Sequence, residues 1–350
     1  MRDPTRRAVL AGASAAAVSA AAVSTTRPAA AAAEQIVVAT WGGDYANLLR
    51  ANVDDPLMTP QGITVVQDTG DEDPRVAKLF AQRRLPRGAA DVVCLQAVRA
   101  HEVDQAGLLE PLDATKVPNL AHVLPNLRTA FYGPHIYSPQ VIIYNPDKVP
   151  DPPRTFTDLL DPRWRGRVGV ADINYFYIMM AAAMATSGNP ETVDADAAHD
   201  LVLKLNANGL RLYPSTDSIG AGVKSGEIDV GLMWLARVIM WQNAGIPVKA
   251  QFPTEGSVLY LSGMVVPKNA ANKPAAFRYL DAIMDPSAQH GFAERMGYLP
   301  TVDNSPLTGA LGERLALPDP APRMLLPDYG VVGKLQGPAS DWWKRNVAHA

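Results

Sequence analysis

The sequence contains a single cysteine, Cys94, so no disulfide can form within the chain. Cys94 lies in the apolar run Asp91–Leu95, which predicts a buried, inert thiol rather than a reactive nucleophile. An excess of basic charge is also missing, because the formal net charge is −3. This slightly acidic balance disfavours a nucleic-acid partner on electrostatic grounds.

Signatures of catalysis and of metal binding are missing as well. The sequence has no G-x-S-x-G motif. None of its histidines is paired at metal-ligand spacing: His101, His122, His135, His199, His290 and His349. The acids Asp71, Glu72 and Asp73 could hold a hard cation, but their place before Pro74 favours a charged helix N-terminus. The sequence therefore predicts a protein that is not an enzyme and has no cofactor or metal, and a secreted enzyme is the less favoured alternative.

The first 33 residues predict an export signal. Thr5–Leu10 matches a twin-arginine motif, and the Ala-rich stretch Ala8–Val23 is too short and too weakly apolar to span a bilayer. Residues 31–33 are alanines and suit a cleavage site before Glu34. The alternative is a disordered Ala-rich leader. No cysteine stands directly after the leader, so we expect an exported protein without a lipid anchor on its mature N-terminus.

The rest of the chain alternates short strands with helices. Length predicts one large or two medium domains. The first strands are expected at Ile36–Thr40, Ile63–Gln67 and Asp91–Leu95, and a helix is expected after the N-cap Asp73 and Pro74. Such alternation favours parallel βαβ units with helices on both faces of the sheet.

The segment Gln140–Asp172 predicts a chain that leaves one compact unit and starts another. An apolar run, Val141–Tyr144, ends at Asn145-Pro146, and a short helix follows with Thr155 as its cap. Alternation then resumes, and Val258–Val266 is expected to cross back. The further strands and helices are expected at Val168–Ala171, Tyr175–Thr186, Leu210–Tyr213, Ser218–Lys224, Val230–Trp234, Leu235–Ala244, Pro274–Met284, Pro286–Met296 and Asp341–Val347.

Several motifs, in this order, resemble one protein family. They are Trp41–Tyr45 after the first strand, Ile142–Asn145, Thr155–Gly166, Ser225–Trp234, Pro253–Gly256 and Gly297–Pro300. Together they resemble the extracytoplasmic solute-binding proteins of ABC importers, in particular the spermidine/putrescine-binding type, over nearly the whole mature chain.

The resemblance implies an α/β, two-lobed periplasmic-binding-protein fold of type II, in which each lobe is a mainly parallel sheet flanked by helices. The first lobe would comprise residues 34–139 and about 263–304, and the second residues 140–262 and about 305–350. A small-molecule ligand would lie in the cleft between the lobes. The implied partners are that ligand and, transiently, the membrane permease, with the protein itself a monomer in the periplasm or on the cell surface.

The resemblance also implies the ligand-binding residues: Trp41, Gly42, Asp44, Tyr45, Asp172, Tyr175, Trp234, Tyr260 and Ser262. The aromatic members follow or end strands, where open α/β sheets place ligands. Core packing is the alternative for each of them. The loop around Trp41 and Tyr45, with its two glycines, favours the ligand, whereas neither alternative is favoured for Trp234.

The carboxylates depart from the family pattern. Asp172 stands where polyamine binders have one acid, but Tyr175 and Ser262 replace two others. A buried ammonium group without a paired carboxylate is very costly. The sequence therefore favours a smaller ligand with one positive group, or a zwitterion, over a polyamine. A ferric-ion or organic-anion binder of the same fold is the alternative, although the Tyr-Tyr pair of ferric binders is absent.

Two loops resemble anion sites. Ser215–Ser218 precedes an expected helix and is interpreted as an N-cap, with an anion on its backbone amides as the alternative. Gly220–Gly226 lacks the order of a phosphate-binding loop, so a helix end is favoured there.

Overall fold

The computed structural model of the protein describes residues 34–348. The predicted export signal lies outside these residues. Within them, no helix combines the length and apolarity needed to cross a membrane. The strands are β1 Glu34–Thr40, β2 Ile63–Thr69, β3 Val92–Gln96, β4 Gly133–Tyr144, β5 Val168–Ala171, β6 Arg211–Tyr213, β7 Val230–Trp234, β8 Lys249–Gln251, β9 Ser257–Val265, β10 Leu299–Pro300 and β11 Met324–Leu325. The α-helices are α1 Gly43–Leu49, α2 Glu72–Gln82, α3 Ala97–Gln105, α4 Tyr175–Ser187, α5 Asp196–Ala207, α6 Thr216–Ser225, α7 Leu235–Asn243, α8 Lys273–Ile283, α9 Pro286–Met296, α10 Gly309–Leu315 and α11 Tyr329–Trp343.

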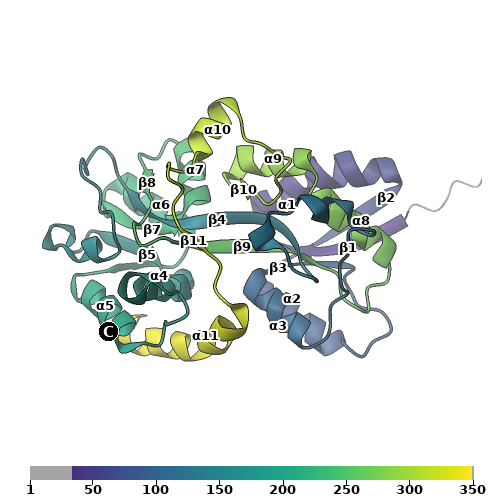
Figure 1. The fold of residues 1–350 in the computed structure, drawn as a ribbon, viewed down its shortest axis with the longest axis horizontal. Helices are drawn as coiled ribbons and strands as arrows, with labels where there is room; N and C mark the ends of the chain where they lie inside the picture. Colours follow the sequence, from purple (N-terminus) through teal and green to yellow (C-terminus); the bar gives the residue numbers. More distant parts are fainter. Residues whose placement is uncertain (1–33, 349–350) are drawn as a thin grey trace, which may run out of the picture. The chain divides into compact units, whose positions relative to one another are not determined.

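The main strands follow one another in the order β2-β1-β3-β9-β4-β7-β5-β6. At one end, β1 pairs in parallel with β2 and β3. At the other end, β5 pairs in parallel with β6 and β7. The predicted parallel βαβ units are thus confirmed in both halves of the chain, and the helices between their strands cover both faces of each half (Figure 1).

Strands β4 and β9 cross between the halves and run antiparallel to their neighbours (Figure 1). The first part of β4, up to Pro139, pairs with β9, and its second part, Gln140–Tyr144, pairs with β7. Strand β9 in turn pairs with β3 through Ser262–Val265. The crossover expected after Gln140 and the return expected at Val258–Val266 therefore both exist, and β4 begins seven residues before the crossover.

The second half illustrates why helices occupy both faces. Successive side chains of a strand point to opposite sides, so Ile142 packs into one hydrophobic cluster while Val141 and Ile143 pack into another. The first of these clusters includes buried residues of α4, α5 and α11, and the second includes buried residues of α6 and α7. A third, larger cluster forms the core of the first half around Ile36, Cys94 and their neighbours.

The helix starts agree with the predicted caps only in part. The backbone N–H of Asp158 donates to Thr155 Oγ1 at 3.0 Å, and the N–H of Thr155 donates to Asp158 Oδ2 at 2.9 Å. The element that follows is a 3-10 helix, Thr157–Leu160, whose N-cap is Phe156 rather than the predicted Thr155. The capping box of Ser215 at α6 is confirmed. The predicted N-cap Asp73 is wrong, because α2 begins at Glu72 with Asp71 before it. The interpretation of these acids as a charged helix N-terminus is confirmed.

The C-terminal helix is longer than predicted. Helix α11 begins at Tyr329, twelve residues before the expected start at Asp341, and continues past Pro338. It packs against α3 from the first half of the chain and against α4 from the second. One helix therefore contacts elements on both sides of the crossing strands.

Candidate functional site

Two adjoining cavities lie where the two halves of the chain meet. The inner cavity has an empty volume of about 640 Å³, and the outer one has about 1420 Å³, with the solvent at their mouths included. Both are lined by residues of α3, α4 and α11, and they share Gln96, Val98, Tyr175 and Gln336. Strand ends supply the key side chains: Gln96 ends β3 and Trp234 ends β7. Such ends are where α/β sheets place ligands.

Aromatic side chains dominate the inner cavity. Six of its fifteen lining residues are aromatic: Tyr175, Phe176, Tyr177, Trp234, Tyr260 and Tyr329. The rings of Tyr177 and Trp234 meet edge to face, with centroids 4.6 Å apart, and those of Trp234 and Tyr260 lie 5.4 Å apart. Burial raises the pKa of the Tyr177 and Tyr260 hydroxyls, so both are neutral at physiological pH. Side-chain amides of Gln96, Asn174 and Gln336 supply polar groups, and the other six lining residues are apolar.

The outer cavity is acidic. Its charged lining residues are Asp71, Glu72, Asp73, Arg99 and Glu102. Arg99 is paired with Asp73 at 3.1 Å and with Glu102 at 2.5 Å, so the lining carries four carboxylates against one guanidinium. A cleft with this balance attracts cations.

Glu72 stands at the junction of the two cavities. Its Oε1 accepts the backbone N–H of Gln96 at 2.5 Å, and Gln96 lines both cavities. Burial raises the pKa of the Glu72 carboxyl, while the hydrogen bond to Gln96 and the charges of Arg75 and Arg99 oppose that rise. The negative charge of Glu72 also contributes to the raised pKa values of Tyr177 and Tyr260. Its field therefore reaches the aromatic lining.

The structure brings together three of the residues that the resemblance implied: Tyr175, Trp234 and Tyr260 all line the inner cavity. Trp41 lines the outer cavity, at the end of β1. The Arg75 guanidinium lies 4.1 Å from the centroid of the Trp41 ring. One aromatic face of Trp41 is therefore already occupied by a cation.

The other implied residues lie outside both linings. Gly42 and Asp44 are exposed near the start of α1. Tyr45 is buried, and its hydroxyl is hydrogen-bonded to His135 Nδ1 at 2.7 Å. Ser262 is fully buried and donates to the carbonyl of Leu95 at 3.3 Å. For Tyr45 and Ser262 this geometry favours the alternative of core packing.

Asp172 is engaged by the C-terminal helix. Its Oδ1 accepts the indole N–H of Trp343 at 2.7 Å, and it does not line the inner cavity. Tyr175 is tied to the same helix, because its hydroxyl donates to the carbonyl of Gln336 at 3.2 Å. These bonds explain how α11 is held against the start of α4.

Sequence reasoning missed Glu72, Tyr177, Tyr329 and Gln336 as lining residues. Tyr177 lies two residues after Tyr175 at the start of a predicted helix, and that position could have drawn attention to it. Tyr329 and Gln336 gave no signal, because α11 was not expected to begin before Asp341. Glu72 was noticed only as one acid of a charged helix N-terminus.

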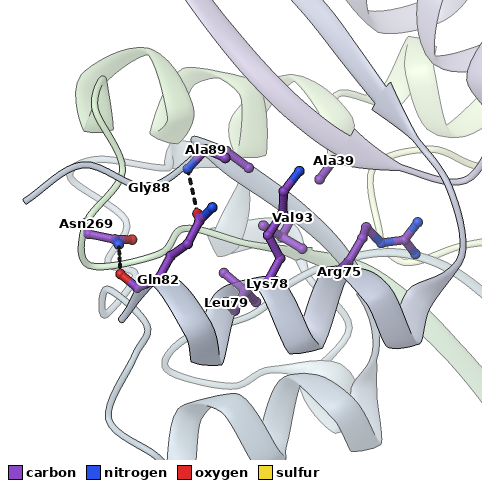
Figure 2. A pocket seen from close by; sticks show the side chains of 10 residues that line it. Ala39, Arg75, Lys78, Leu79, Gln82, Gly88, Ala89, Val93 and Asn269 are labelled. Atoms are coloured by element: carbon purple, nitrogen blue, oxygen red, sulfur yellow. Dashed lines mark hydrogen bonds between the residues drawn. The ribbon is translucent and has the colours of Figure 1, made fainter. Parts of the chain in front are cut away.

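A different cavity, between α2 and the sheet of the first half, is a weaker candidate. It has an empty volume of about 330 Å³ and is lined mostly by apolar groups and by side chains that bond locally. Figure 2 shows Gln82 Oε1 accepting from the N–H of Ala89 and Asn269 Nδ2 donating to the carbonyl of Gln82. The side-chain amides of Gln82 and Asn269 are therefore already satisfied. Arg75 Nε and Nη2 have no hydrogen-bond partner among the residues that the structure describes, but with a lining that is otherwise largely apolar we do not assign a ligand here.

Metal binding finds no support in the geometry. Within residues 34–348, no three side chains of His, Cys, Asp or Glu are grouped so that they could hold a metal ion. Cys94 is fully buried beside Tyr45 and Ser262, and burial raises the pKa of its thiol. The predicted burial of the thiol is confirmed, and the raised pKa disfavours the reactive thiolate.

Two α/β halves joined by crossing strands, with a cavity at their junction, define a periplasmic-binding-protein fold. Residues 54–317 match the family of bacterial extracellular solute-binding proteins. The chain belongs to this family, whose members bind solutes outside the cytoplasm for ABC transporters and are not enzymes.

Comparison with individual proteins agrees with this assignment. The chain is 24% identical to the spermidine/putrescine-binding periplasmic protein of Escherichia coli over 248 residues, which is 68% of this chain and 70% of that protein. It is 28% identical to iron uptake protein A2 of Synechocystis, over 59% of this chain and 63% of that protein. Its fold is similar to that of the Atu4243 GABA receptor, with a TM-score of 0.79, 22% identity and coverage of 91% and 99%.

Proposed function

We propose that this substrate-binding protein captures a small organic solute with one positively charged group and delivers it to an ABC permease. The observation that carries the proposal is the inner cavity, which joins six aromatic side chains to an acidic outer cavity. Aromatic faces attract cations by about 0.5–2 kcal/mol each, depending on desolvation. The acidic mouth adds a longer-range attraction of the same sign.

The two lobes are proposed to close on the solute by a hinge motion. We retain the bounds expected from sequence, with residues 34–139 and about 263–304 in one lobe and 140–262 and about 305–350 in the other. The crossing strands β4 and β9 and the helix α11 connect these lobes. A solute that contacts both linings would favour the closed form only to the extent of its higher affinity for that form.

Four of the implied residues are proposed to contact the solute. Trp234, Tyr260 and Tyr175 would contact the solute in the inner cavity, and Trp41 would contact it in the outer cavity. Asp172 is proposed to act indirectly, because its carboxylate is engaged by Trp343. Gly42, Asp44, Tyr45 and Ser262 are proposed to shape the first lobe rather than to touch the solute.

A polyamine is a poor fit for this site. Each ammonium of a diamine needs its own counter-charge once it is buried, and among the described residues the inner cavity is lined by no Asp or Glu. An ω-amino acid or another zwitterion also has a single cationic group, and the similarity of fold to a GABA receptor agrees with a ligand of this size. The structure adds nothing that favours a ferric ion.

Export by the predicted twin-arginine signal and a monomeric state in the periplasm or at the cell surface belong to the same proposal. Its test is titration calorimetry on the purified mature protein with a panel of monoamines, diamines, amino acids, sugars and organic anions. We expect at least one solute with a single cationic group to bind more tightly than any diamine, sugar or anion. Tightest binding of an uncharged or purely anionic solute would refute the proposed function.

A pair of tryptophan variants sharpens this test. Trp41→Ala should weaken the best solute at least about tenfold, or about 1.4 kcal/mol, because it opens the wall of the outer cavity. Trp342→Ala is the matched control, since Trp342 stacks on His199 with ring centroids 4.0 Å apart and lines neither cavity. Equal affinities of the two variants would remove Trp41 from the site.

A further inference from the structure

We propose that the inner cavity selects an N-methylated ammonium group, such as a trimethylammonium, rather than a primary amine. This inference rests on the proposed function and specifies the solute's cationic head. It depends on three features of the described residues: the aromatic lining, the lack of a carboxylate in that lining, and the acidic mouth outside it.

The aromatic wall is built for contact with a bulky cation. Tyr177, Trp234 and Tyr260 pack on one another at centroid distances from 4.6 to 6.5 Å and come from α4, β7 and β9. Tyr329, from the start of α11, belongs to the same lining. Quaternary ammonium groups are recognised by such clusters of aromatic faces, because the ring quadrupole attracts the cation while the methyl groups make van der Waals contact.

The chemistry of the remaining lining disfavours a primary ammonium. Such a group has three N–H donors, and each needs an acceptor when it is buried. Among residues 34–348, the lining of the inner cavity includes no Asp or Glu. The backbone carbonyl of Gln336 already accepts from Tyr175, and the side-chain acceptors of the lining are neutral amides and tyrosine hydroxyls. A trimethylammonium has no N–H, so it leaves no donor unsatisfied.

Charge attraction comes from the outer cavity. Glu72 lies at the junction through its hydrogen bond to Gln96, and Asp71, Asp73 and Glu102 line the same outer space. These carboxylates would draw in a cation without bonding to it directly. Trp41 competes poorly for the cation, because the Arg75 guanidinium already covers one face of its ring at 4.1 Å. The aromatic lining of the inner cavity is therefore the better binding position for the cationic group of the solute.

Matched probes test this inference by calorimetry on the mature protein. Choline and 3,3-dimethyl-1-butanol have the same shape but differ in charge, whereas choline and ethanolamine differ in N-methylation. We expect choline to bind at least about tenfold more tightly than either of the other two, and tetramethylammonium to bind more tightly than putrescine. Ethanolamine binding as tightly as choline would overturn the inference and leave the proposed function intact. Putrescine binding as tightly as every solute with a single cationic group would overturn both. If a neutral solute or an anion is preferred to every cation in the panel, the proposed function fails as well.

Variants of Tyr260 test whether the aromatic lining of the inner cavity is where the cationic group binds. Tyr260→Phe keeps the aromatic face and should keep choline affinity within about threefold. Tyr260→Leu removes the face and should weaken choline at least about fivefold, while 3,3-dimethyl-1-butanol changes by less than about twofold. Tyr144→Leu is the control, because Tyr144 ends β4 and lines neither cavity. Equal losses for the cation and its neutral isostere in Tyr260→Leu would overturn the assignment of this wall to the charged head.

Discussion

Removing the Asp172 carboxylate should destabilise the protein without abolishing solute binding. Asp172 Oδ1 accepts the indole N–H of Trp343 at 2.7 Å, and Trp343 is only 2% exposed. In Asp172→Ala that N–H stays buried and loses its partner. A hydrogen bond to a charged group contributes about 1.5–3 kcal/mol, and the partial exposure of Asp172 places the expected loss near the lower bound, at about 2 kcal/mol.

Thermal unfolding measures this loss. For a protein of this size, 1 kcal/mol shifts the midpoint by about 2 °C, so Asp172→Ala should unfold about 4 °C below the parent protein. Asp172→Asn keeps an acceptor oxygen and should lose less than about 1 kcal/mol. The control is Asp200→Ala, whose exposed ion pair with Lys204 contributes less than about 0.5 kcal/mol.

The competing outcome is clear, because the family resemblance implied that Asp172 binds the solute. Calorimetric titration of the same variants with the tightest-binding solute of the panel separates a structural role of Asp172 from a role in solute binding. We expect less than a threefold change in affinity. An unchanged melting point together with lost binding would show that Asp172 is a ligand carboxylate and that its bond to Trp343 does not stabilise the fold.

Two further predictions concern the scaffold. In Gly231→Ala, the added methyl group would clash with the carbonyl oxygen of Gly169 on the neighbouring strand, so urea unfolding should reveal a loss of about 2–3 kcal/mol. Gly70→Ala, with open space around it, is the control. Equal stabilities of the two variants would contradict the close contact of β5 and β7. Burial lowers the pKa of His135 from 6.5 to about 3. Between these two pH values the unfolded chain binds a proton that the folded chain does not. The free energy of unfolding should therefore fall as the pH drops below about 6.5, by about 2 kcal/mol at pH 5. His135→Gln should lose less stability than the parent between pH 7 and pH 5, and an identical loss would show that His135 is not the group responsible.

Much of the fold was predictable because local patterns and tertiary structure agree. β5, β7 and α9 begin and end at the predicted residues, since each is an apolar run or a periodic segment bounded by turn residues. Helix α11 was missed over its first twelve residues. Gly330, Gly333, Gly337 and Pro338 weaken its helical signal, and packing against α3 and α4 stabilises it instead.

The candidate site was predictable only in part. Trp234 ends a strand, and the structure places it at the inner cavity, as the general rule for α/β sheets suggests. The role of Asp172 depends on Trp343, which lies 171 residues away in the chain. No local sequence pattern predicts a hydrogen bond between residues so far apart in the chain. Contact of Trp234 or Tyr260 with a solute stays a prediction.

The lone thiol of Cys94 offers a built-in reporter of folding. It is fully buried in β3, within the core of the first half, beneath Tyr45 and Ser262. A thiol reagent can reach it only when that core opens, so the rate of labelling measures the free energy of opening at a single known position. Any solute that stabilises the folded protein should slow this labelling, and no engineered probe is needed to observe it.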